Sequence, residues 1–566
     1  MSPSPLRKEL ALFLSKTIAS LPALAGGGGV PMPPMEDSFE IPREEKFGDL
    51  SSTVVLRLAK EARKAPRILA EEIVKRLNET LPKSALSGRV QKISVEGPGF
   101  VNFYFSNEEI AAILLEIASK KEDFGKPRLK SKKILLEFVS ANPTGPLTVA
   151  HGRQAALGDS LARILRFCGH QVTTEYYNND EGVQINTLGA STLMRLKQRL
   201  NNQVTELPEN YYQGAYLIEI AGKLNEQEPS FLKLPEEEQL ARCATFAKNE
   251  IMEGIKKDLK DFETAFDSYY SQEALARSGK VEKTLEELKQ KNVVYENESA
   301  LWLRSTTYGD DKDRVLIKSD KTYTYLTPDI SYHHEKFRRG FDMLIDILGP
   351  DHHGYIARLK ASQAALGHDP ARVHVLIAQL VTLFEGTKQV RMSTRAGEFV
   401  TLRQILEEVG KDAGRFFFVM RKFDAHLDFD LALAKSQTPE NPVFYIQYAH
   451  ARIESIKNQC AEKGIKIMAA DAKCLSRLSD PAEIRLMRLL GQYEDNVHGA
   501  EKTLEPYRLV PYLMDLAAAF HRFYTENRVV TEDESLTQAR LTLINAVQAV
   551  LKSGLNLLGV SAPVKM

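Results

Sequence analysis

The chain has 566 residues, with 75 basic and 75 acidic side chains. This length exceeds what one hydrophobic core supports, so about three or four domains are expected; 43% hydrophobic and 27% charged residues are typical of a globular enzyme. No run of about 20 apolar residues predicts a membrane span, and four scattered cysteines without a CxxC pair argue against a disulfide framework and favour a reducing, cytoplasmic setting.

Residues 1–112 predict a small α+β domain. Leu6, Leu10 and Leu14 follow helical spacing, and Glu9 and Lys16 interrupt what would otherwise resemble the apolar core of a secretory signal. A Gly/Pro loop follows over residues 25–34, and residues 90–106 predict two strands around an EGPG turn.

A larger unit is predicted over residues 113–436, and the basic segment at 120–133 within it predicts a linker. Leu135 to Val139 predicts a buried strand that contains Glu137, residues 140–146 (SANPTGP) must be irregular, and helical spacing starts at Leu147. A strand, an irregular turn and a helix N-terminus form the phosphate site of many α/β proteins, and His151 lies in the first helical turn. An ordinary core strand and helix are the alternative.

The next stretches predict more of the same α/β unit. Residues 170–185 predict a strand, and residues of about 190–295 predict an inserted helical subdomain without chemical motifs. Tyr323 to Leu326 predicts a strand that Thr327 and Pro328 end, with Asp329 opening a helix. DMLIDI at 342–347 predicts another strand, followed by the turn LGPDHHG.

Histidines gather near this turn. His333 and His334 precede it and HHG at 352–354 lies within it, but no carboxylate or cysteine falls at a zinc-binding spacing. We therefore expect no structural metal.

A basic loop follows a predicted strand at 373–383. Lys388, Arg391 and Arg395 lie in it, and Thr401 with Gln404 forms a capping box for the next helix. Such a loop could close over a triphosphate and neutralise the departing pyrophosphate, or it could be a solvated basic loop.

Residues 437–566 predict a bundle of four or five helices. Asn441 and Pro442 are suited to the N-cap and first turn of its first helix. Tyr445, Tyr448 and Arg452 share one face of that helix; such a stripe is more often core, although aromatic and guanidinium planes also stack on RNA bases.

Several motifs resemble one family. TVAH at 148–151, preceded by NPTGPL, resembles the HIGH signature of class I aminoacyl-tRNA synthetases, and EFVSANPTGPLTVAHGR resembles the arginyl members. RMSTR at 391–395 resembles their KMSKS loop, and GPD at 349–351 resembles the Gly-x-Asp element that holds the adenosine ribose. FGDLSS and EGPGFVNF resemble the N-terminal domain of arginyl-tRNA synthetases, and NPVFYIQYAHARI and LLGVSAPVKM resemble their anticodon-binding domain.

The resemblance implies a multidomain α/β protein. Its parts would be a Rossmann-type parallel-sheet catalytic domain with a helical insertion, a small α+β N-terminal domain against the corner of the tRNA, and an all-α anticodon-binding bundle. The implied activity is arginine–tRNA ligation, which joins L-arginine to ATP and passes the arginyl group to tRNA(Arg). We expect ATP as substrate with Mg²⁺, a monomer, no membrane, and a need for bound tRNA before activation.

The resemblance also assigns residues. A guanidinium has five donors, so its pocket needs acceptors, and Glu137, Tyr325 and Asp329 match the family's side-chain pocket. Without a guanidinium, Glu137 would be an unpaired buried carboxylate, which costs several kcal/mol. Asn142 matches the residue that holds the α-amino or carboxylate group.

The remaining assignments concern ATP, catalysis and tRNA. Those for ATP are Pro143, Thr144, Gly145, His151, Gly152, Gly349, Asp351, His353, Met392 and Ser393. Those for catalysis are Thr148, His151, Lys388, Arg391 and Arg395, and those for tRNA are Tyr445, Tyr448 and Arg452. The HIGH-type motif comprises Ala141, Asn142, Pro143, Thr144, Gly145, Pro146, Leu147, Thr148, Val149, Ala150 and His151.

Two departures from the family pattern stand out. Thr148 replaces the first histidine of HIGH, and Thr394 replaces the lysine expected in the second half of KMSKS. Some arginyl enzymes have a compensating lysine just before HIGH, where this chain has Gly145. A basic residue of the loop must then carry the phosphate charge.

Two other interpretations stay open. A small-molecule adenylate-forming ligase could use the same nucleotide site, although the terminal domains would then be unexplained. A non-catalytic RNA-binding relative is the second, and Thr148 and Thr394 would be its evidence.

Overall fold

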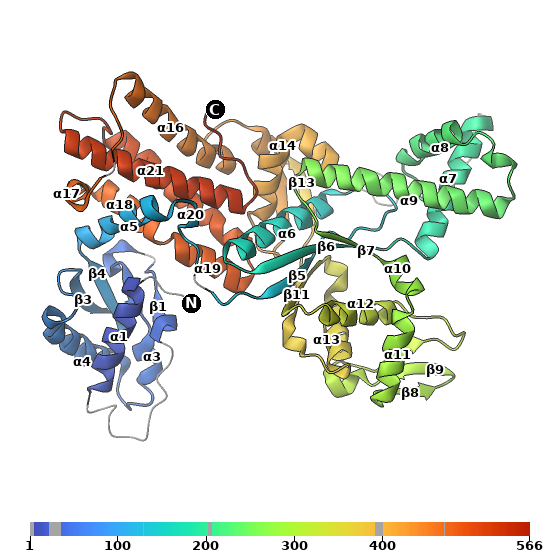
Figure 1. The fold of residues 1–566 in the computed structure, drawn as a ribbon, viewed down its shortest axis with the longest axis horizontal. Helices are drawn as coiled ribbons and strands as arrows, with labels where there is room; N and C mark the ends of the chain where they lie inside the picture. Colours follow the sequence, from blue (N-terminus) through green and yellow to red (C-terminus); the bar gives the residue numbers. More distant parts are fainter. Residues whose placement is uncertain are drawn as a thin grey trace.

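The protein is an elongated assembly of three parts around a central parallel sheet (Figure 1). The computed structural model describes residues 5–21, 35–42, 44–127, 129–201, 206–390, 400–468 and 470–566. The N-terminal domain lies beside the C-terminal helices at one end, and a helical arm projects at the other, formed by α7 (Val183–Asn201), α8 (Tyr216–Gln227) and α9 (Glu236–Asp261). The predicted fold class is confirmed.

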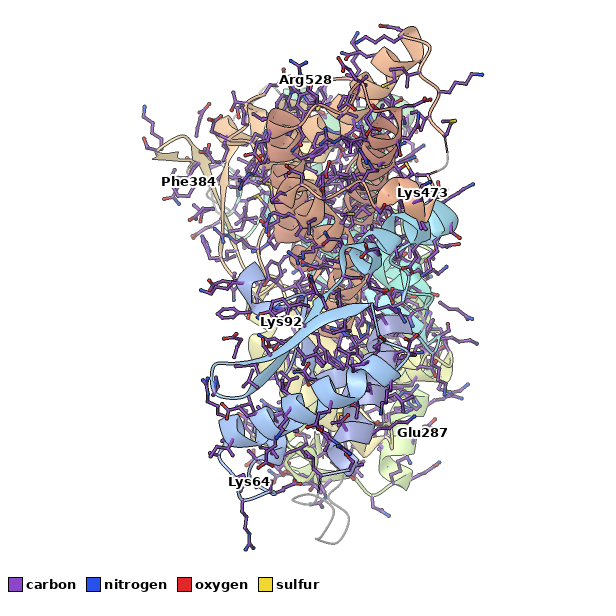
Figure 2. All side chains as sticks on the ribbon, turned by 90° about the vertical axis from the view of Figure 1, so that its left-hand side faces the viewer. Lys64, Lys92, Glu287, Phe384, Lys473 and Arg528 are labelled. Atoms are coloured by element: carbon purple, nitrogen blue, oxygen red, sulfur yellow. The ribbon has the colours of Figure 1, made fainter. Side chains whose placement is uncertain are left out.

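The N-terminal domain is built on a four-stranded antiparallel sheet with its own hydrophobic core. The strand order is β1 (Phe39–Glu40), β2 (Leu50–Ser52), β4 (Phe100–Phe105) and β3 (Val90–Glu96), with helices α1 (Pro5–Ala19), α3 (Val54–Leu58) and α4 (Pro66–Thr80). The predicted β3–β4 hairpin and first helix are therefore confirmed. Figure 2 looks onto this end of the molecule, where exposed Lys92 of β3 points outward and covers the ring of Tyr104 at 4.8 Å.

The central sheet has five parallel strands, and its chain order reverses in the middle. The spatial order is β12 (Val373–Ile377), β11 (Met343–Leu348), β5 (Lys133–Glu137), β6 (Gln171–Asn178) and β7 (Ser268–Ser271). From β5 the chain moves to β6 and β7 on one side and returns to β11 and β12 on the other. Ligands of open α/β sheets bind at the carboxyl ends of the two strands on either side of such a reversal, here β5 and β11.

The stretch predicted to be helical from about 190 to 295 is more varied. It contains β7, an edge strand of the central sheet, then α10 (Gln272–Arg277), α11 (Lys280–Gln290) and the start of β8 (Val294–Asn297). β8 pairs with β9 (Ala300–Leu303) and β9 with β10 (Arg314–Ile317) in a small antiparallel sheet. The sequence SYYS of β7 has no apolar run because its side chains are half-buried or exposed, which explains why the prediction missed it.

Two other predicted strands need correction. The stretch from Tyr323 forms no strand beyond one bridge to Ile317, and α12 (Leu326–Arg338) already begins where the strand was expected to end. Residues 373–383 form two strands rather than one, because the chain leaves the central sheet after β12 and enters a second sheet as β13 (Val381–Glu385).

The second small sheet supports the basic loop. Its order is β14 (Lys388–Gln389), β13 and β15 (Leu427–Asp430), with β13 parallel to β15. The loop then leads into α14 (Leu402–Val419), whose predicted capping box of Thr401 and Gln404 is confirmed.

The C-terminal part is the predicted helical bundle, although its described residues form six helices and not the four or five expected, one of them only four residues long. Asn441 accepts a hydrogen bond from the Val443 amide at 3.2 Å as the N-cap of the first helix. A continuous core joins the bundle to α5 (Asn107–Lys120), the central sheet, α6 (Val149–Phe167) and α14. The helices are α16 (Pro442–Glu462), α17 (Ala472–Leu475), α18 (Pro481–Gly491), α19 (Tyr493–Thr503), α20 (Leu509–Glu526) and α21 (Glu534–Leu557). Within the described ranges, no helix combines the length and apolarity that a membrane crossing needs.

Candidate active site

The chain makes a strained turn directly after β5. Val139 and Ser140 have φ values of 66° and 39°, which side chains rarely adopt and which are most costly for a β-branched residue. Ser140 Oγ donates to Glu137 Oε1 at 3.0 Å and accepts from the Tyr177 amide at 3.0 Å, and Tyr176 donates to the Ala141 carbonyl at 2.7 Å. These bonds hold the SANPTGP turn in one shape at the reversal point of the sheet.

His151 is both a helix cap and the imidazole of the site. Its Nδ1 accepts from the Thr148 amide at 3.1 Å, so the proton of the neutral ring is on Nε2. A dense protein environment lowers the pKa of His151 to about 4, so the ring is neutral near pH 7. Among the residues that the structure describes, none accepts a hydrogen bond from Nε2, which leaves this donor for a ligand at the N-terminus of α6.

The turn after β11 lies at the same edge of the sheet. Gly349 precedes the 3₁₀ helix η7 (Pro350–Tyr355), and a Cβ built on Gly349 would lie 2.7 Å from Asp351 Oδ1. Glycine therefore leaves room for the exposed Asp351 carboxylate, which suits the predicted ribose contact. The side chain of His353 lies outside what the structure describes.

Glu137 is not an unpaired carboxylate, so that part of the sequence argument is wrong. Lys336 of α12, fully buried, donates to Glu137 Oε2 and to Asp346 Oδ1, each at 2.6 Å. Burial opposes the lysine's charge, but Asp346 and Glu137 outweigh it and raise the pKa of Lys336. His333 completes the cluster by contacting Asp346 Oδ2 at 3.0 Å.

Asp329 has a different environment from Glu137. Its carboxylate accepts from the Tyr355 hydroxyl, and no described Lys, Arg or His side chain forms an ion pair with it. Burial raises the pKa of Asp329, and nearby Glu137 adds to the rise. Both carboxylates also raise the pKa of half-buried Tyr177, after the larger effect of desolvation, so all three groups share one region.

Tyr325 was predicted to line the arginine pocket, but the structure does not bring it together with Glu137 and Asp329. It stands at the start of α12 with 86% of its surface exposed. Its contact with a substrate stays a prediction.

The raised pKa of Asp329 predicts a pH-dependent affinity for arginine. A guanidinium stays charged throughout, so it needs Asp329 ionised, and the KM for arginine should rise as the pH falls through the raised pKa and level off above it. The Tyr355 hydroxyl opposes the rise, so Tyr355→Phe should move the dependence to higher pH. The KM for arginine, measured against pH in both proteins, tests this; superimposable profiles would contradict it.

The helical arm contacts the SANPTGP turn. Tyr216 of α8 donates to the Thr144 carbonyl at 2.5 Å, and its hydroxyl would lie 3.1 Å from a Cβ on Gly145. Asn142 Nδ2 donates to Gln184 Oε1 of α7 at 2.7 Å. The predicted arginine and ATP residues of this turn are thus held by a part of the chain that carried no motif.

The rest of the HIGH-type motif is mostly structural in its contacts. Leu147, Val149 and Ala141 are buried in the main core, with Pro143 also buried and Pro146 and Ala150 half-buried. A Cβ on Gly152 would lie 3.0 Å from Leu402 and 3.1 Å from Phe418, so this glycine permits close packing of α6 on α14. An ATP contact by Gly152 stays a prediction.

The segment that follows the basic loop is hydrogen-bonded to the start of α6. The Val149 amide donates to the Val400 carbonyl at 3.0 Å, and the Leu402 amide donates to the Leu147 carbonyl at 2.8 Å. Lys388 is exposed on β14 at the other end of the loop. The remaining predicted loop residues lie outside the described residues: Arg391, Met392, Ser393, Thr394 and Arg395.

Arg153 connects α6 to the chain segments that precede β13 and β15. This buried guanidinium donates to the carbonyls of Gln379, Lys422 and Ala425 at 2.8, 2.8 and 2.9 Å. Burial lowers the pKa of Arg153 to about 10, because carbonyl groups rather than a paired carboxylate surround it.

Arg153→Met should destabilise the protein by about 3 kcal/mol or more, because three partly buried carbonyls lose a charged donor. Arg153→Lys, which keeps the charge but not the fork, should lose less. Urea unfolding midpoints of the three proteins measure the difference. An unchanged midpoint in Arg153→Met would contradict this stabilising role of Arg153.

The predicted aromatic stripe of α16 exists and is half-buried. Tyr445 lies 4.5 Å from the His521 ring, and Arg452 stacks on Tyr448 at 4.6 Å and on Tyr524 of α20 at 4.8 Å. The stripe thus combines packing with partly accessible rings, and a role in RNA binding stays a prediction.

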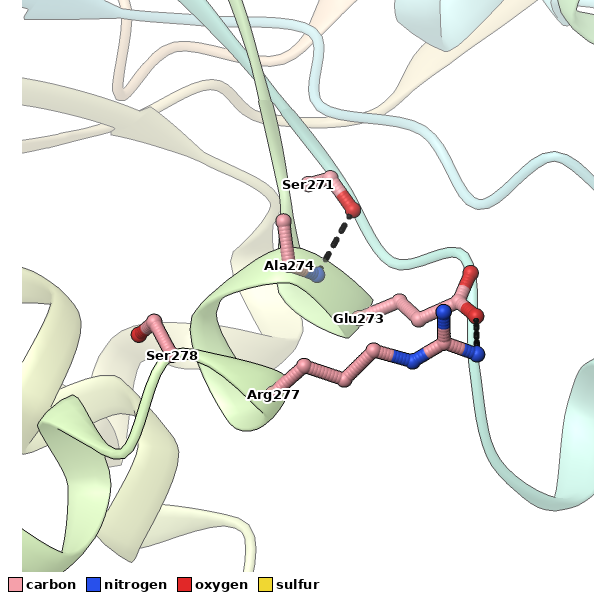
Figure 3. Close-up of a pocket in the computed structure, with 5 residues that line it drawn as sticks. All are labelled: Ser271, Glu273, Ala274, Arg277 and Ser278. Carbon is pink, nitrogen blue, oxygen red and sulfur yellow. Dashed lines mark hydrogen bonds and ion pairs between the residues drawn. The ribbon is translucent and has the colours of Figure 1, made fainter.

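Two cavities lie away from this site. One of about 420 Å³ (Figure 3) is lined by the start of α10, where Ser271 Oγ caps the Ala274 amide at 3.0 Å and Arg277 pairs with Glu273 at 2.5 Å. The other, of about 610 Å³, lies between the N-terminal domain and the bundle, where Arg488 pairs with Asp49 at 2.5 Å. Neither cavity is lined by a predicted site residue.

Several residues of the site belong to no sequence motif and were not predicted. They are Lys336, Tyr355, Tyr177, Gln184, Tyr216 and Arg153. One signal was available: Asp329, His333 and Lys336 have the spacing i, i+4 and i+7, which places them on one face of α12.

Comparisons with known proteins agree with this geometry. The family model of the class I tRNA synthetase (R) catalytic domain matches residues 110–422, that of the arginyl-tRNA synthetase N-terminal domain matches 8–105, and that of the DALR anticodon-binding domain matches 446–566. An arginine–tRNA ligase of Desulfosudis oleivorans is 47% identical over 532 residues, 93% of this chain and 94% of that protein. The chain belongs to the arginyl-tRNA synthetase family.

Other members of this family are similar over comparable lengths. An arginine–tRNA ligase of Syntrophotalea carbinolica is 45% identical over 94% of this chain and 95% of its own. The crystal structure of a putative arginyl-tRNA synthetase from Campylobacter jejuni has a TM-score of 0.74 at 37% identity, covering 82% of this chain and all of that one. The arginyl-tRNA synthetase of Thermus thermophilus has the same fold, with a TM-score of 0.76 at 23% identity over 99% of this chain and all of its own.

Proposed function

We propose that this protein activates L-arginine with ATP and transfers the arginyl group to tRNA(Arg). The observation that carries the proposal is the meeting, at one reversal point of the sheet, of a helix N-terminus bearing the free His151 donor with the carboxylates Glu137 and Asp329. Acceptors for a guanidinium and donors for a phosphate thus lie at one site.

The first step would be an in-line displacement at the α-phosphorus of ATP. A carboxylate oxygen of arginine forms a bond to this phosphorus, the bond to the β-phosphate oxygen breaks, and pyrophosphate leaves. Such a step needs positioning and charge stabilisation rather than a protein nucleophile. The Nε2–H of His151 and the amides at the start of α6 would donate to the phosphate oxygens, with Asp351 on the ribose.

The second step would make the ester. The oxygen of a hydroxyl of the terminal tRNA ribose attacks the arginyl carbonyl, its proton passes to solvent, and AMP leaves with the bonding electrons of the mixed anhydride. Tyr445, Tyr448 and Arg452 of the bundle would contact the tRNA, and the N-terminal domain would contact its corner.

We propose that ATP is used with Mg²⁺. In the described part of the chain, no three His, Cys, Asp or Glu side chains gather around a metal-sized site, so the triphosphate itself would bring the ion. A cytoplasmic monomer with domains at 1–112, 113–436 and 437–566 completes the proposal.

Pyrophosphate exchange with arginine, with and without tRNA, tests the proposal. We expect exchange that depends on arginine and occurs only when tRNA is bound. Full exchange without any RNA dependence, together with no aminoacylation, would indicate a small-molecule ligase. Tight tRNA binding with no exchange under either condition would indicate a non-catalytic relative.

A further inference from the structure

The two carboxylates of the proposed arginine pocket are not equivalent. Glu137 already has a positive partner, because Lys336 Nζ lies 2.6 Å from its Oε2. Ser140 donates to its other oxygen at 3.0 Å. Both oxygens are therefore oriented before any substrate arrives.

Lys336 itself is held from three sides. It is fully buried, it pairs with Asp346 of β11 at 2.6 Å as well as with Glu137 of β5, and it lies over the Tyr332 ring at 4.3 Å. His333 contacts Asp346 at 3.0 Å and the Asp329 carbonyl at 2.9 Å. The cluster thus ties the two strands of the reversal point to the helix that carries Asp329.

Asp329 has no such partner. A tyrosine hydroxyl is its hydrogen-bond donor, and the described residues provide it with no ion pair. Its burial without a cation is consistent with the raised pKa of Asp329. A substrate guanidinium would supply the missing positive charge.

We propose that Lys336 is a positioning residue that orients Glu137 and offsets part of its charge in advance, so that Asp329 contributes most of the selection of a charged guanidinium over a neutral side chain of the same shape. Glu137 then contributes hydrogen-bond geometry, and Asp329 contributes most of the charge discrimination. This inference rests on the proposed function.

Citrulline, which replaces the guanidinium with a neutral urea group, separates the two roles. Glu137→Gln and Asp329→Asn each remove one carboxylate and keep the side-chain shape. Glu137→Gln should weaken the binding of arginine and of citrulline alike by ~10-fold, because one acceptor is weakened. The ratio of the two affinities should stay within about threefold of the wild-type ratio. Asp329→Asn should lower the arginine-to-citrulline ratio by ~10²-fold, because the uncompensated charge pair is lost.

Lys336 is tested in the same assay. Lys336→Met should raise the ratio of the arginine affinity to the citrulline affinity by ~10-fold and should weaken citrulline binding, because Glu137 then loses its positive partner and its fixed orientation. Lys336→Arg should restore both values toward wild type. A purely structural lysine would weaken both ligands equally, and that outcome would overturn the proposal.

Calorimetric titration of the full-length protein measures both affinities, with far-ultraviolet circular dichroism to confirm folding. If Lys336→Met does not fold, the Glu137→Gln and Asp329→Asn pair still decides: an equal loss of discrimination in both would overturn the inference. Failure of the wild type to bind arginine would instead overturn the proposed function.

Discussion

Replacing His151 with Gln should lower kcat for arginyl-adenylate formation by ~10²–10³-fold, the effect of losing one preorganised donor to a transition-state oxygen. The KM values for arginine and ATP should change by no more than about threefold, because the lost contact strengthens only in the transition state. Single-turnover formation of the adenylate measures the rate constant of this step directly. The neutral ring predicts no step in kcat from imidazole titration between about pH 6 and about pH 8, since the pKa of His151 is lowered to about 4.

The choice of Gln separates catalysis from helix capping. His151 Nδ1 accepts from the Thr148 amide, and Gln at this third helical position can accept the same bond in a capping box. His151→Gln should therefore keep its unfolding free energy within about 0.5 kcal/mol, whereas His151→Ala should lose about 1 kcal/mol. Unchanged kcat in His151→Gln would show that the imidazole only caps the helix.

The second large effect is expected in the basic loop. Lys388→Ala or Arg395→Ala should slow pyrophosphate exchange by ~10²-fold or more, because Lys388, Arg391 or Arg395 must carry the phosphate charge in place of the lysine that Thr394 replaces. Lys388 is exposed on β14 and forms no ion pair among the described residues, so it is available for a phosphate. Transfer from preformed arginyl-adenylate to tRNA should stay near the wild-type rate, because pyrophosphate has already left.

Lys435→Ala is a matched control for this experiment. Lys435 of α15 (Leu431–Lys435) lies beside the same small sheet but pairs with Glu408 at 2.7 Å. Its removal should leave exchange unchanged. Wild-type exchange in both Lys388→Ala and Arg395→Ala would contradict the assignment of this loop to the phosphates.

Elements with strong local signals were predictable. The β3–β4 hairpin, the strand–turn–helix around residues 135–165 and the capping box at Thr401 depend on turn residues, apolar spacing and capping side chains that are adjacent in the chain. β7 was missed because an edge strand with half-buried side chains has no apolar run. The break between β12 and β13 was missed because both strands are apolar and only their different sheets separate them.

Local sequence is sufficient to identify the family, the order of the three parts and the chemical types of the site residues, because motif residues and their spacing are local properties of the chain. The pairing of those residues depends on the tertiary structure. The tertiary structure places Lys336 between Glu137 and Asp346, gives Asp329 no cationic partner among the described residues, and joins Val400 to the start of α6. Charge neutralisation depends on which side chains meet across strands and helices far apart in sequence, and that pairing is settled only when the sheet assembles.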